Sequence, residues 1–267
     1  MEEFAEVFDA AFIDEGIRNI YEPTDDFAQL TEIPTTGIEL RNDIEGFIGQ
    51  DLLVIGSPFE KIDQLDWSQG DNSYNALGCC GLASCANLLN IADIPCDEES
   101  IVGYAIENDL CNYGDSWFDR LFGDPASDGG TNDLQIEQIL EDHGLSVTAY
   151  PSHSPEGSVD GLANAVESGH GVTIGVNAGM LWDDPNCYDM GQANHQITVT
   201  GTLRNPETGE LVGFCICDSG RGLESDACRS ITREEMEACY GNAAYSTAII
   251  TDYPISNTLT TKGGTPA

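Results

Sequence analysis

The sequence predicts an α+β fold in which a helical N-terminal lobe packs on an antiparallel sheet, and three observations support this. A compact apolar stretch with helical spacing runs from about Cys80 to Ile91. Two further helical patterns cover residues 132–143 and 159–168. From residue 195 onward, two runs rich in Ile, Val and Thr are separated by the turn sequence RNPETGE, which is typical of a β-hairpin.

The pattern also suggests how the chain is organised. Residues 1–66 mix a possible amphipathic helix, within residues 1–22, with Pro, Asp, Thr and short apolar runs, and we interpret them as an N-terminal accessory segment. Residues 67–253 carry the helices and strands of the main domain. The polar, glycine-containing residues 254–267 are interpreted as a C-terminal tail.

The charge balance restricts the partners that this protein can have. The chain has 267 residues, with 9 basic and 47 acidic side chains, for a formal charge of −38. Phosphate backbones and anionic lipids attract basic patches, so we expect no nucleic-acid partner and no membrane partner. The acidity fits a halophilic solvation shell, the solubility of a secreted protein or a cationic peptide or protein partner, and composition does not separate these explanations.

Two features bear on localisation. The first residues, MEEFAEVFDAAFIDEG, carry acids where a secretory signal needs a basic start and an apolar stretch, so Sec export is not expected. No window approaches 18 consecutive apolar residues, and we expect a soluble protein. The compartment is left unknown, and export by a signal-independent route stays open.

The chain contains ten cysteines, but their spacing does not match a metal knuckle. Cys215 and Cys217 point to one strand face, where core packing is the better interpretation than a metal site. The acidic stretches also lack the ligand spacing of a calcium loop. We therefore expect no metal and no cofactor, while the pairing of the cysteines in disulfides cannot be read from the sequence.

One cysteine stands at a position that favours a reactive thiol. Cys80 is predicted at the N-terminus of the helix that ends near Ile91, where free backbone N–H groups and the helix dipole stabilise a thiolate. Gly81 follows it and would let a substrate approach closely. Cys79 precedes the turn, and Cys85 lies inside the helix as a small buried hydrophobe. The alternative is that Cys79 and Cys80 are buried thiols or disulfide partners.

A thiolate nucleophile needs a base and a group that orients this base. His195 opens the first strand of the predicted hairpin, and the returning strand LVGFCIC ends at Asp218, so the two side chains should meet at one rim of the sheet. There the carboxylate can hold the imidazole in the useful tautomer. The other histidines, His143, His153 and His170, are better explained as capping or turn residues.

Several stretches in this order resemble a known family. These are QG…LGCCGLASCANLL, GGTNDLQIEQILEDHGL, SVDGLANAVESGHGVTIGVN, NHQITVTGTLRNPETGELVGFCICDSG and SITREEMEACY. Together they resemble the peptidase C39-like branch of the papain-like cysteine peptidases, over roughly residues 67–252. The resemblance implies a papain-like fold, with Cys80 as nucleophile, His195 as base and Asp218 as its orienting partner.

The resemblance departs from the family pattern at the oxyanion glutamine. The family usually has this Gln about six residues before the nucleophile, whereas Gln69 lies farther away and Tyr74 holds the expected place. Gln69 followed by an inserted loop is our assignment, and Asn72 or Asn75 are alternatives. Any of these amides would stabilise the developing oxyanion beside the Cys80 backbone N–H, an effect of about 3 kcal/mol. Many family members are fused to a transporter and cut leader peptides, and we do not carry that activity over.

The sequence therefore predicts a thiol peptidase or amidohydrolase that acts on a peptide or protein substrate without a cofactor. Two other functions stay open. The same residues would support a protein-modifying transglutaminase or deamidase, in which the acyl group comes from a Gln side chain. A binding module whose cysteines are paired in disulfides would use none of this chemistry.

Overall fold

The computed structural model describes residues 37–56, 58–114 and 128–255. The predicted amphipathic helix within residues 1–22 and most of the predicted tail lie outside these ranges. The described helices are α2 (Cys80–Ile91), α3 (Glu98–Glu107), α5 (Asp133–Asp142), α6 (Val159–Glu167), α7 (Ala178–Trp182) and α8 (Arg233–Met236), with short 3-10 turns at Ile62–Gln64, Pro185–Cys187, Asp189–Gly191 and Glu224–Cys228 and a π turn at Glu237–Gly241. The strands are β1 (Ile38–Arg41), β2 (Leu52–Gly56), β3 (Val147–Pro151), β4 (Val172–Val176), β5 (His195–Arg204), β6 (Leu211–Cys217), β7 (Arg229–Thr232) and β8 (Thr247–Thr251).

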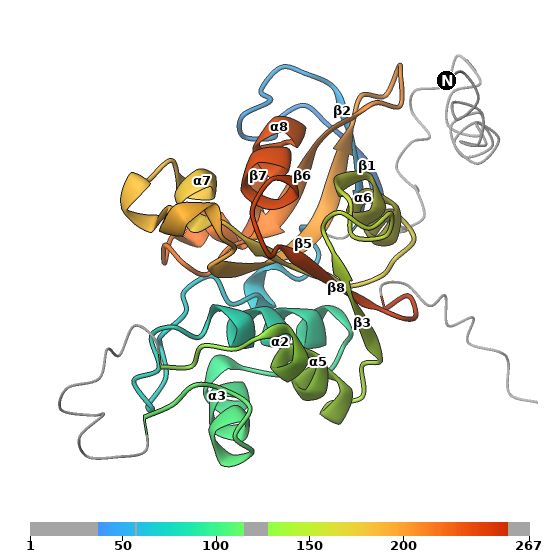
Figure 1. Ribbon diagram of the computed structural model, residues 1–267. Coiled ribbons are helices and arrows are strands. Elements are labelled where there is room, and N and C mark those ends of the chain that lie inside the picture. Colours follow the sequence, from blue (N-terminus) through green and yellow to red (C-terminus); the bar gives the residue numbers. More distant parts are fainter. Residues whose placement is uncertain (1–36, 57, 115–127, 256–267) are drawn as a thin grey trace, which may run out of the picture.

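All eight described strands join one antiparallel sheet. Its main path runs β1-β2-β5-β4-β8-β3, and β6 and β7 extend it from the other edge of β5. Helices α2, α3 and α5 gather on one side of the sheet, while α6, α7 and α8 lie on the other (Figure 1). The predicted class, helices packed with an antiparallel sheet, is confirmed.

Strand β5 holds this sheet together because both its edges are occupied. Its first half pairs with β4, from Val176 opposite His195 to Val172 opposite Val199. Its second half, Gly201–Arg204, pairs with β2 along the same edge, and β6 covers the opposite edge. The segment before residue 67 thus adds two strands to the sheet, and the division of the chain at that residue stays a prediction.

The buried apolar side chains form three clusters around the sheet. One lies between α2, α3 and α5 and the sheet and includes the fully buried Leu82, Leu88 and Ile139. A second surrounds Phe214 on the side of α6 and α8. A third, which we call the β2 cluster, consists of Ile44, Phe47, Leu52, Val54, Leu203 and Cys215, with Phe59, Val212 and Cys228 packed against it.

Helix α2 is buried almost along its whole length, which follows from its composition. It contains no charged residue, and ten of its side chains, from Gly81 to Asn90, are buried. Its packing on β5 brings its first turn to the end of the sheet where β5 begins. A helix that buries this much apolar surface is fixed in position, because each buried large apolar side chain contributes about 1.5–3 kcal/mol.

Candidate active site

The first turn of α2 and the first residue of β5 form the centre of the site. Cys80 is the first residue of α2, after Cys79 in the N-cap position, and it is half-buried. The thiol of Cys80 interacts with the side chain of His195 and with the backbone N–H groups of Gly81 and Gln196, and all three interactions lower its pKa. The sulfur atom therefore lies between the first turn of α2 and the start of β5, two segments that are far apart in the sequence.

The structure also brings His195 and Asp218 together. His195 Nε2 lies 2.7 Å from Asp218 Oδ1, and both side chains are buried. Since Asp218 uses Nε2, the ring directs Nδ1 toward Cys80. His195 begins β5, and Asp218 directly follows the last residue of β6, so pairing of these two strands creates the contact.

Asp218 has three further partners. Trp182 Nε1 donates to its Oδ2 at 2.7 Å, and the backbone N–H of Gly220 donates to its Oδ1 at 3.0 Å. Arg229 Nη1 lies 3.7 Å from Oδ2. A buried carboxylate with several donors keeps its charge, because these hydrogen bonds replace the water that it has lost.

The ionisation of the three groups follows from these contacts. Burial alone would raise the pKa of the Cys80 thiol, but the hydrogen bond and the charge of His195 outweigh it and lower this pKa below its ordinary value. Burial alone would lower the pKa of His195, yet the hydrogen bonds to Asp218 and Cys80 raise it to about 10. For Asp218 the bonds from His195 and Trp182 overcome burial and lower the pKa to about 2. The arrangement favours a thiolate, an imidazolium and a carboxylate in one row.

The thiols of Cys79 and Cys85 have raised pKa values, in contrast to the thiol of Cys80. Cys79 is fully buried, and burial together with the charge of Glu98 raises the pKa of its thiol well above the usual range. Burial raises the pKa of Cys85 in the same direction. Among these three cysteines, Cys80 alone has a lowered pKa, and its role as the nucleophile stays a prediction.

Gln69 is linked to Ser219, the residue after Asp218, and part of the hydrogen-bonding capacity of its side chain is already used. Its backbone N–H donates to the carbonyl of Ser219 at 3.1 Å, and its Oε1 accepts from the Ser219 hydroxyl at 3.1 Å. Its Nε2 donates to the carbonyl of Leu77 at 2.9 Å. An amide nitrogen carries two N–H bonds, so one donor of Gln69 remains for another acceptor.

The two alternative amides are placed differently. Asn72 is tied into its own loop, with its Nδ2 donating to Glu98 Oε1 at 2.7 Å and its Oδ1 accepting from the backbone of Ala76 at 3.0 Å. Asn75 is exposed and has a positive φ of 59°. The side-chain nitrogen and oxygen of Asn72 are thus both occupied within its own loop, and the choice of Gln69 over Asn72 and Asn75 stays a prediction.

Trp182 is the residue that the sequence analysis missed. Its ring centroid lies 5.0 Å from that of His195, and it is the last residue of the short helix α7. A Cβ built on Gly220 would come within 2.4 Å of the Trp182 ring and 2.8 Å of His195 Cε1, so this glycine permits the close approach. Only the folded contact identifies Trp182, because no local sequence pattern distinguishes it from a core aromatic.

The described part of the chain contains neither a metal-ligand group nor a membrane-spanning helix. No group of three or more His, Cys, Asp or Glu side chains there is arranged to hold a metal ion. No helix among the described elements is long and apolar enough to cross a bilayer. All ten cysteines lie within the described ranges, and each is a free thiol.

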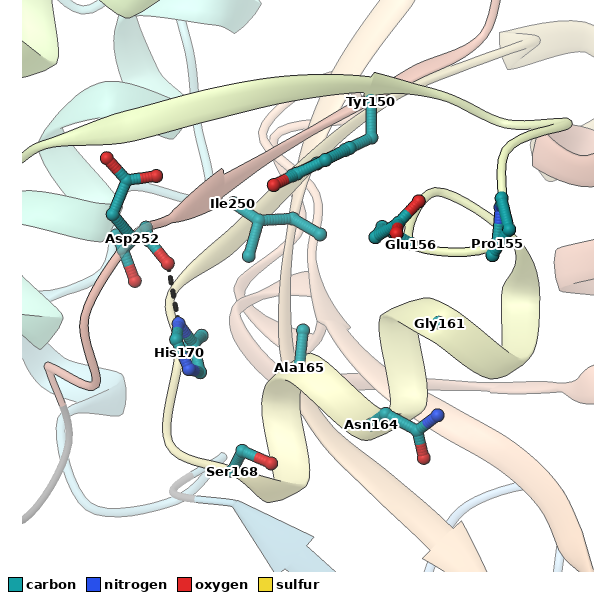
Figure 2. Close-up of a pocket in the computed structure, with 11 residues that line it drawn as sticks. Tyr150, Pro155, Glu156, Gly161, Asn164, Ala165, Ser168, His170, Ile250 and Asp252 are labelled. Carbon is teal, nitrogen blue, oxygen red and sulfur yellow. Dashed lines mark hydrogen bonds between the residues drawn. The ribbon is translucent and has the colours of Figure 1, made fainter. Parts of the chain in front are cut away.

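A separate hollow of about 440 Å³ lies at the far end of β4 from His195. Figure 2 shows Tyr150, Ile250 and Ala165 facing this hollow, with the polar side chains of Glu156 and Asn164 at one side. His170 Nδ1 pairs there with the carbonyl of Thr251. None of the residues that line it belongs to the site around Cys80.

Comparisons with known proteins give distant likenesses only. No protein-family model matches the chain, and no curated protein matches it. A double glycine motif protease from an AMS/PCAT transporter, solved with its leader peptide, is 17% identical with a TM-score of 0.36, over 64% of this chain and 83% of that one. SERA5E from Plasmodium falciparum is 13% identical with a TM-score of 0.41, over 75% of this chain and 95% of that one.

Proposed function

We propose that this protein is a papain-like thiol peptidase or amidohydrolase in which Cys80 attacks the carbonyl carbon of an amide. The observation that carries the proposal is the hydrogen-bonded row from Cys80 through His195 to Asp218. A thiolate is a strong nucleophile, and it needs a neighbouring cation and an orienting group to exist at neutral pH. In this proposal His195 is the cation and Asp218 is the orienting group, and they lie at the start of β5 and directly after β6.

The reaction proceeds in two steps. The Cys80 sulfur forms a bond to the carbonyl carbon, and the imidazolium of His195 gives its proton to the leaving amine as the C–N bond breaks. A water molecule then attacks the thioester, loses a proton to His195, and releases the acid with regeneration of the thiolate. Asp218 accepts a hydrogen bond from Nε2 throughout and holds the ring in one orientation.

The oxyanion of the tetrahedral intermediate needs its own donors. The free N–H of Gln69 and the backbone N–H of Cys80 are our candidates, since Gln69 is fixed by Ser219 and Leu77. Removal of one such donor commonly costs about 3 kcal/mol in the rate. In this proposal Gln69→Ala lowers kcat about 100-fold, whereas Asn75→Ala, an exposed amide on the same loop, leaves it unchanged.

The substrate that we expect is a cationic peptide or protein segment. The formal charge of −38 creates a negative field around the whole molecule, which attracts cations and accelerates their encounter. Salt screens this field, so kcat/KM for a basic peptide should fall between low and physiological ionic strength. An equal response of basic and acidic peptides to salt would contradict this substrate class.

The test of the proposal is covalent trapping together with product analysis. The full chain is treated with iodoacetamide at pH 6, and the modified peptide is mapped in the native protein and in His195→Ala. We expect labelling at Cys80 that depends on His195, and loss of peptide hydrolysis in Cys80→Ala. Cys79→Ala is the matched control, because it removes the adjacent buried thiol and should keep both activities.

The product analysis separates hydrolysis from the other acyl-transfer reactions. Peptides with internal Gln residues are incubated with the protein, and cleavage and ammonia are measured in the same sample. Chain cleavage without ammonia supports the peptidase. Ammonia without cleavage assigns the site to deamidation or transglutamination, and no reaction with unlabelled Cys80 leaves a binding module.

A further inference from the structure

A second pair of thiols, Cys215 and Cys228, lies outside the proposed catalytic site. Cys215 belongs to β6, and Cys228 is the residue directly before β7. Cys215 belongs to the β2 cluster, and Cys228 packs against this cluster. The two thiols shift the pKa of each other, although neither takes part in the chemistry proposed for Cys80.

The sheet explains why these two side chains meet. Strands β6 and β7 are neighbours in the sheet (Figure 1). In their register, Cys215 lies opposite Ser230 and Ile216 opposite Arg229. Cys228 lies just beyond the end of this ladder. Both sulfur atoms belong to the β2 cluster, where Cys215 is buried and Cys228 packs from the edge.

The two thiols differ in a way that suits an ordered reaction. Cys228 is half-buried, and the hydrogen bond from Cys215 lowers the pKa of its thiol. The positive charge of Arg41, whose guanidinium carbon lies 4.6 Å from the centre of the Phe59 ring, acts in the same direction. The hydrogen bond to Cys228, with burial added, raises the pKa of Cys215 well above its usual range. Cys228 is therefore the accessible nucleophile, and Cys215 is the resolving thiol.

We propose that Cys215 and Cys228 are a site of reversible disulfide formation by a low-molecular-weight disulfide such as oxidised glutathione. The Cys228 thiolate attacks one sulfur of the small disulfide, forms a mixed disulfide and releases one small thiolate. Cys215 then loses its proton and attacks the Cys228 sulfur, and the second small thiolate leaves. In sum, the two protein thiols are oxidised to one disulfide, and the small disulfide is reduced to two small thiols.

A disulfide between Cys215 and Cys228 would close a loop of residues 215–228, and this loop forms one wall of the site around Cys80. The closed loop, residues 215–228, contains Asp218 and Gly220, and Asp218 is hydrogen-bonded to His195. Within this loop the backbone N–H of Asp218 already donates to the carbonyl of Asp226 at 3.0 Å. A covalent bond across its base reduces the freedom of the unfolded loop and stabilises the folded one.

The first experiment maps the bond in the full chain with Cys80→Ala, which removes the reactive thiol of the proposed catalytic site. The protein is incubated with oxidised glutathione, the remaining thiols are alkylated, and the protein is digested with trypsin without reduction. We expect peptides 205–221 and 222–229 to be joined, with the loss of two hydrogen atoms and with full reversal by dithiothreitol. Hydrogen exchange in residues 218–226 should slow on oxidation, and Tm should rise by about 5 °C.

Matched variants identify the partner, because peptide 205–221 also contains Cys217. Cys217→Ser should still form the joined peptides, whereas Cys215→Ser and Cys228→Ser should not. Persistence of the joined peptides in Cys215→Ser, or two freely alkylated thiols in oxidised protein with Cys80→Ala alone, would overturn the proposal. These readouts need no peptidase activity, so this proposal and the proposed function can fail independently.

Discussion

The indole N–H of Trp182 donates a hydrogen bond of 2.7 Å to the carboxylate of Asp218. The same ring lies over His195, at an angle of 56° between the two ring planes. Trp182 therefore fixes the acidic partner with its polar edge and shields the contact between Asp218 and His195 with its apolar surface. Both effects strengthen the hydrogen bond between Asp218 and His195, because water competes less with it.

Replacement of Trp182 by Phe tests the polar part of this relationship. The ring remains in Trp182→Phe, but the hydrogen bond to a charged carboxylate, worth about 1.5–3 kcal/mol, is lost. We expect kcat to fall about 10–100-fold with little change in KM. Steady-state kinetics on the best peptide substrate measure this split, with Tyr253→Phe, a change at an exposed aromatic side chain, as control. A Trp182→Phe protein with native kcat would show that the indole serves packing alone.

The pH dependence follows from the two shifted pKa values of the Cys80 and His195 pair. Because the pKa of Cys80 is lowered, its thiolate forms at a lower pH than that of an ordinary thiol. The raised pKa of His195 keeps the imidazolium protonated up to about pH 10. Alkylation of Cys80 should therefore set in at a lower pH than alkylation of an ordinary thiol and stay fast above pH 10. Hydrolysis should decline as the pH passes about 10, because the proton donor to the leaving amine is lost.

The control for the pH experiment is His195→Ala. Without the imidazolium, the onset of Cys80 alkylation should move up toward the ordinary range of a thiol. Rates are measured by mass spectrometry of the modified peptide at fixed ionic strength. An alkylation profile that is the same in native protein and in His195→Ala would show that the ring does not stabilise the thiolate.

Gly220→Ala tests the close packing around Asp218. The added methyl group would come within 2.4 Å of Trp182 and 2.8 Å of His195, so the ring of one of them must move. We expect activity to fall at least tenfold, since small displacements of the base cost about 1.4 kcal/mol or more. Gly175→Ala is the matched control, because a Cβ there meets no atom closer than 3.4 Å. Equal kinetics of the two variants would contradict the packing argument.

Glu98 gives a prediction about stability rather than activity. Its carboxylate accepts hydrogen bonds from the backbone of Gly70 at 2.9 Å and from Asn72 at 2.7 Å, and thus holds the loop that follows Gln69. Burial and the nearby Asp66 raise the pKa of Glu98 to about 7. Since the folded state favours the protonated acid, the contribution of Glu98 to stability is present at pH 5 and is lost as the pH rises past about 7.

The corresponding experiment compares Tm between pH 5 and pH 8.5 in native protein and in Glu98→Gln. The amide cannot ionise, so the decline of Tm with rising pH should be smaller in Glu98→Gln, and its Tm at pH 8.5 should exceed the native value. Glu99→Gln is the control, because Glu99 is exposed and its pKa is lowered by Ser73. A parallel decline of Tm in all three proteins would contradict the assignment.

The elements that carry the site could be read from local sequence. The apolar run after Cys79 predicted a helix from Cys80 to Ile91, and α2 has these bounds. The alternating residues predicted a strand that begins at His195, as β5 does. They also predicted a returning strand that ends at Asp218, and β6 ends one residue earlier, at Cys217. Helix and strand periods act over a few residues, which is why a single sequence reveals them.

Other parts of the site depend on contacts that no local pattern encodes. Trp182 reaches Asp218 across 36 positions of the chain, and Asn72 is held by Glu98 across 26. The distance of Gln69 from Cys80 in sequence suggested an inserted loop, but only the fold shows that Ser219 holds its amide. Such long-range pairs depend on how the sheet and helices pack, and the spacing of residues in the chain does not determine that packing.

The pairing of β2 with the second half of β5 has a practical consequence for work with shortened proteins. A recombinant fragment that starts at residue 67 would lack β1 and β2, so the backbone of Gly201–Arg204 would lose its partner on one side. The fragment would also expose Leu203, which is fully buried in the β2 cluster. An open strand edge beside apolar side chains invites pairing with a second molecule. Such fragments should precipitate or form oligomers, whereas the chain that retains residues 37–56 covers this edge itself.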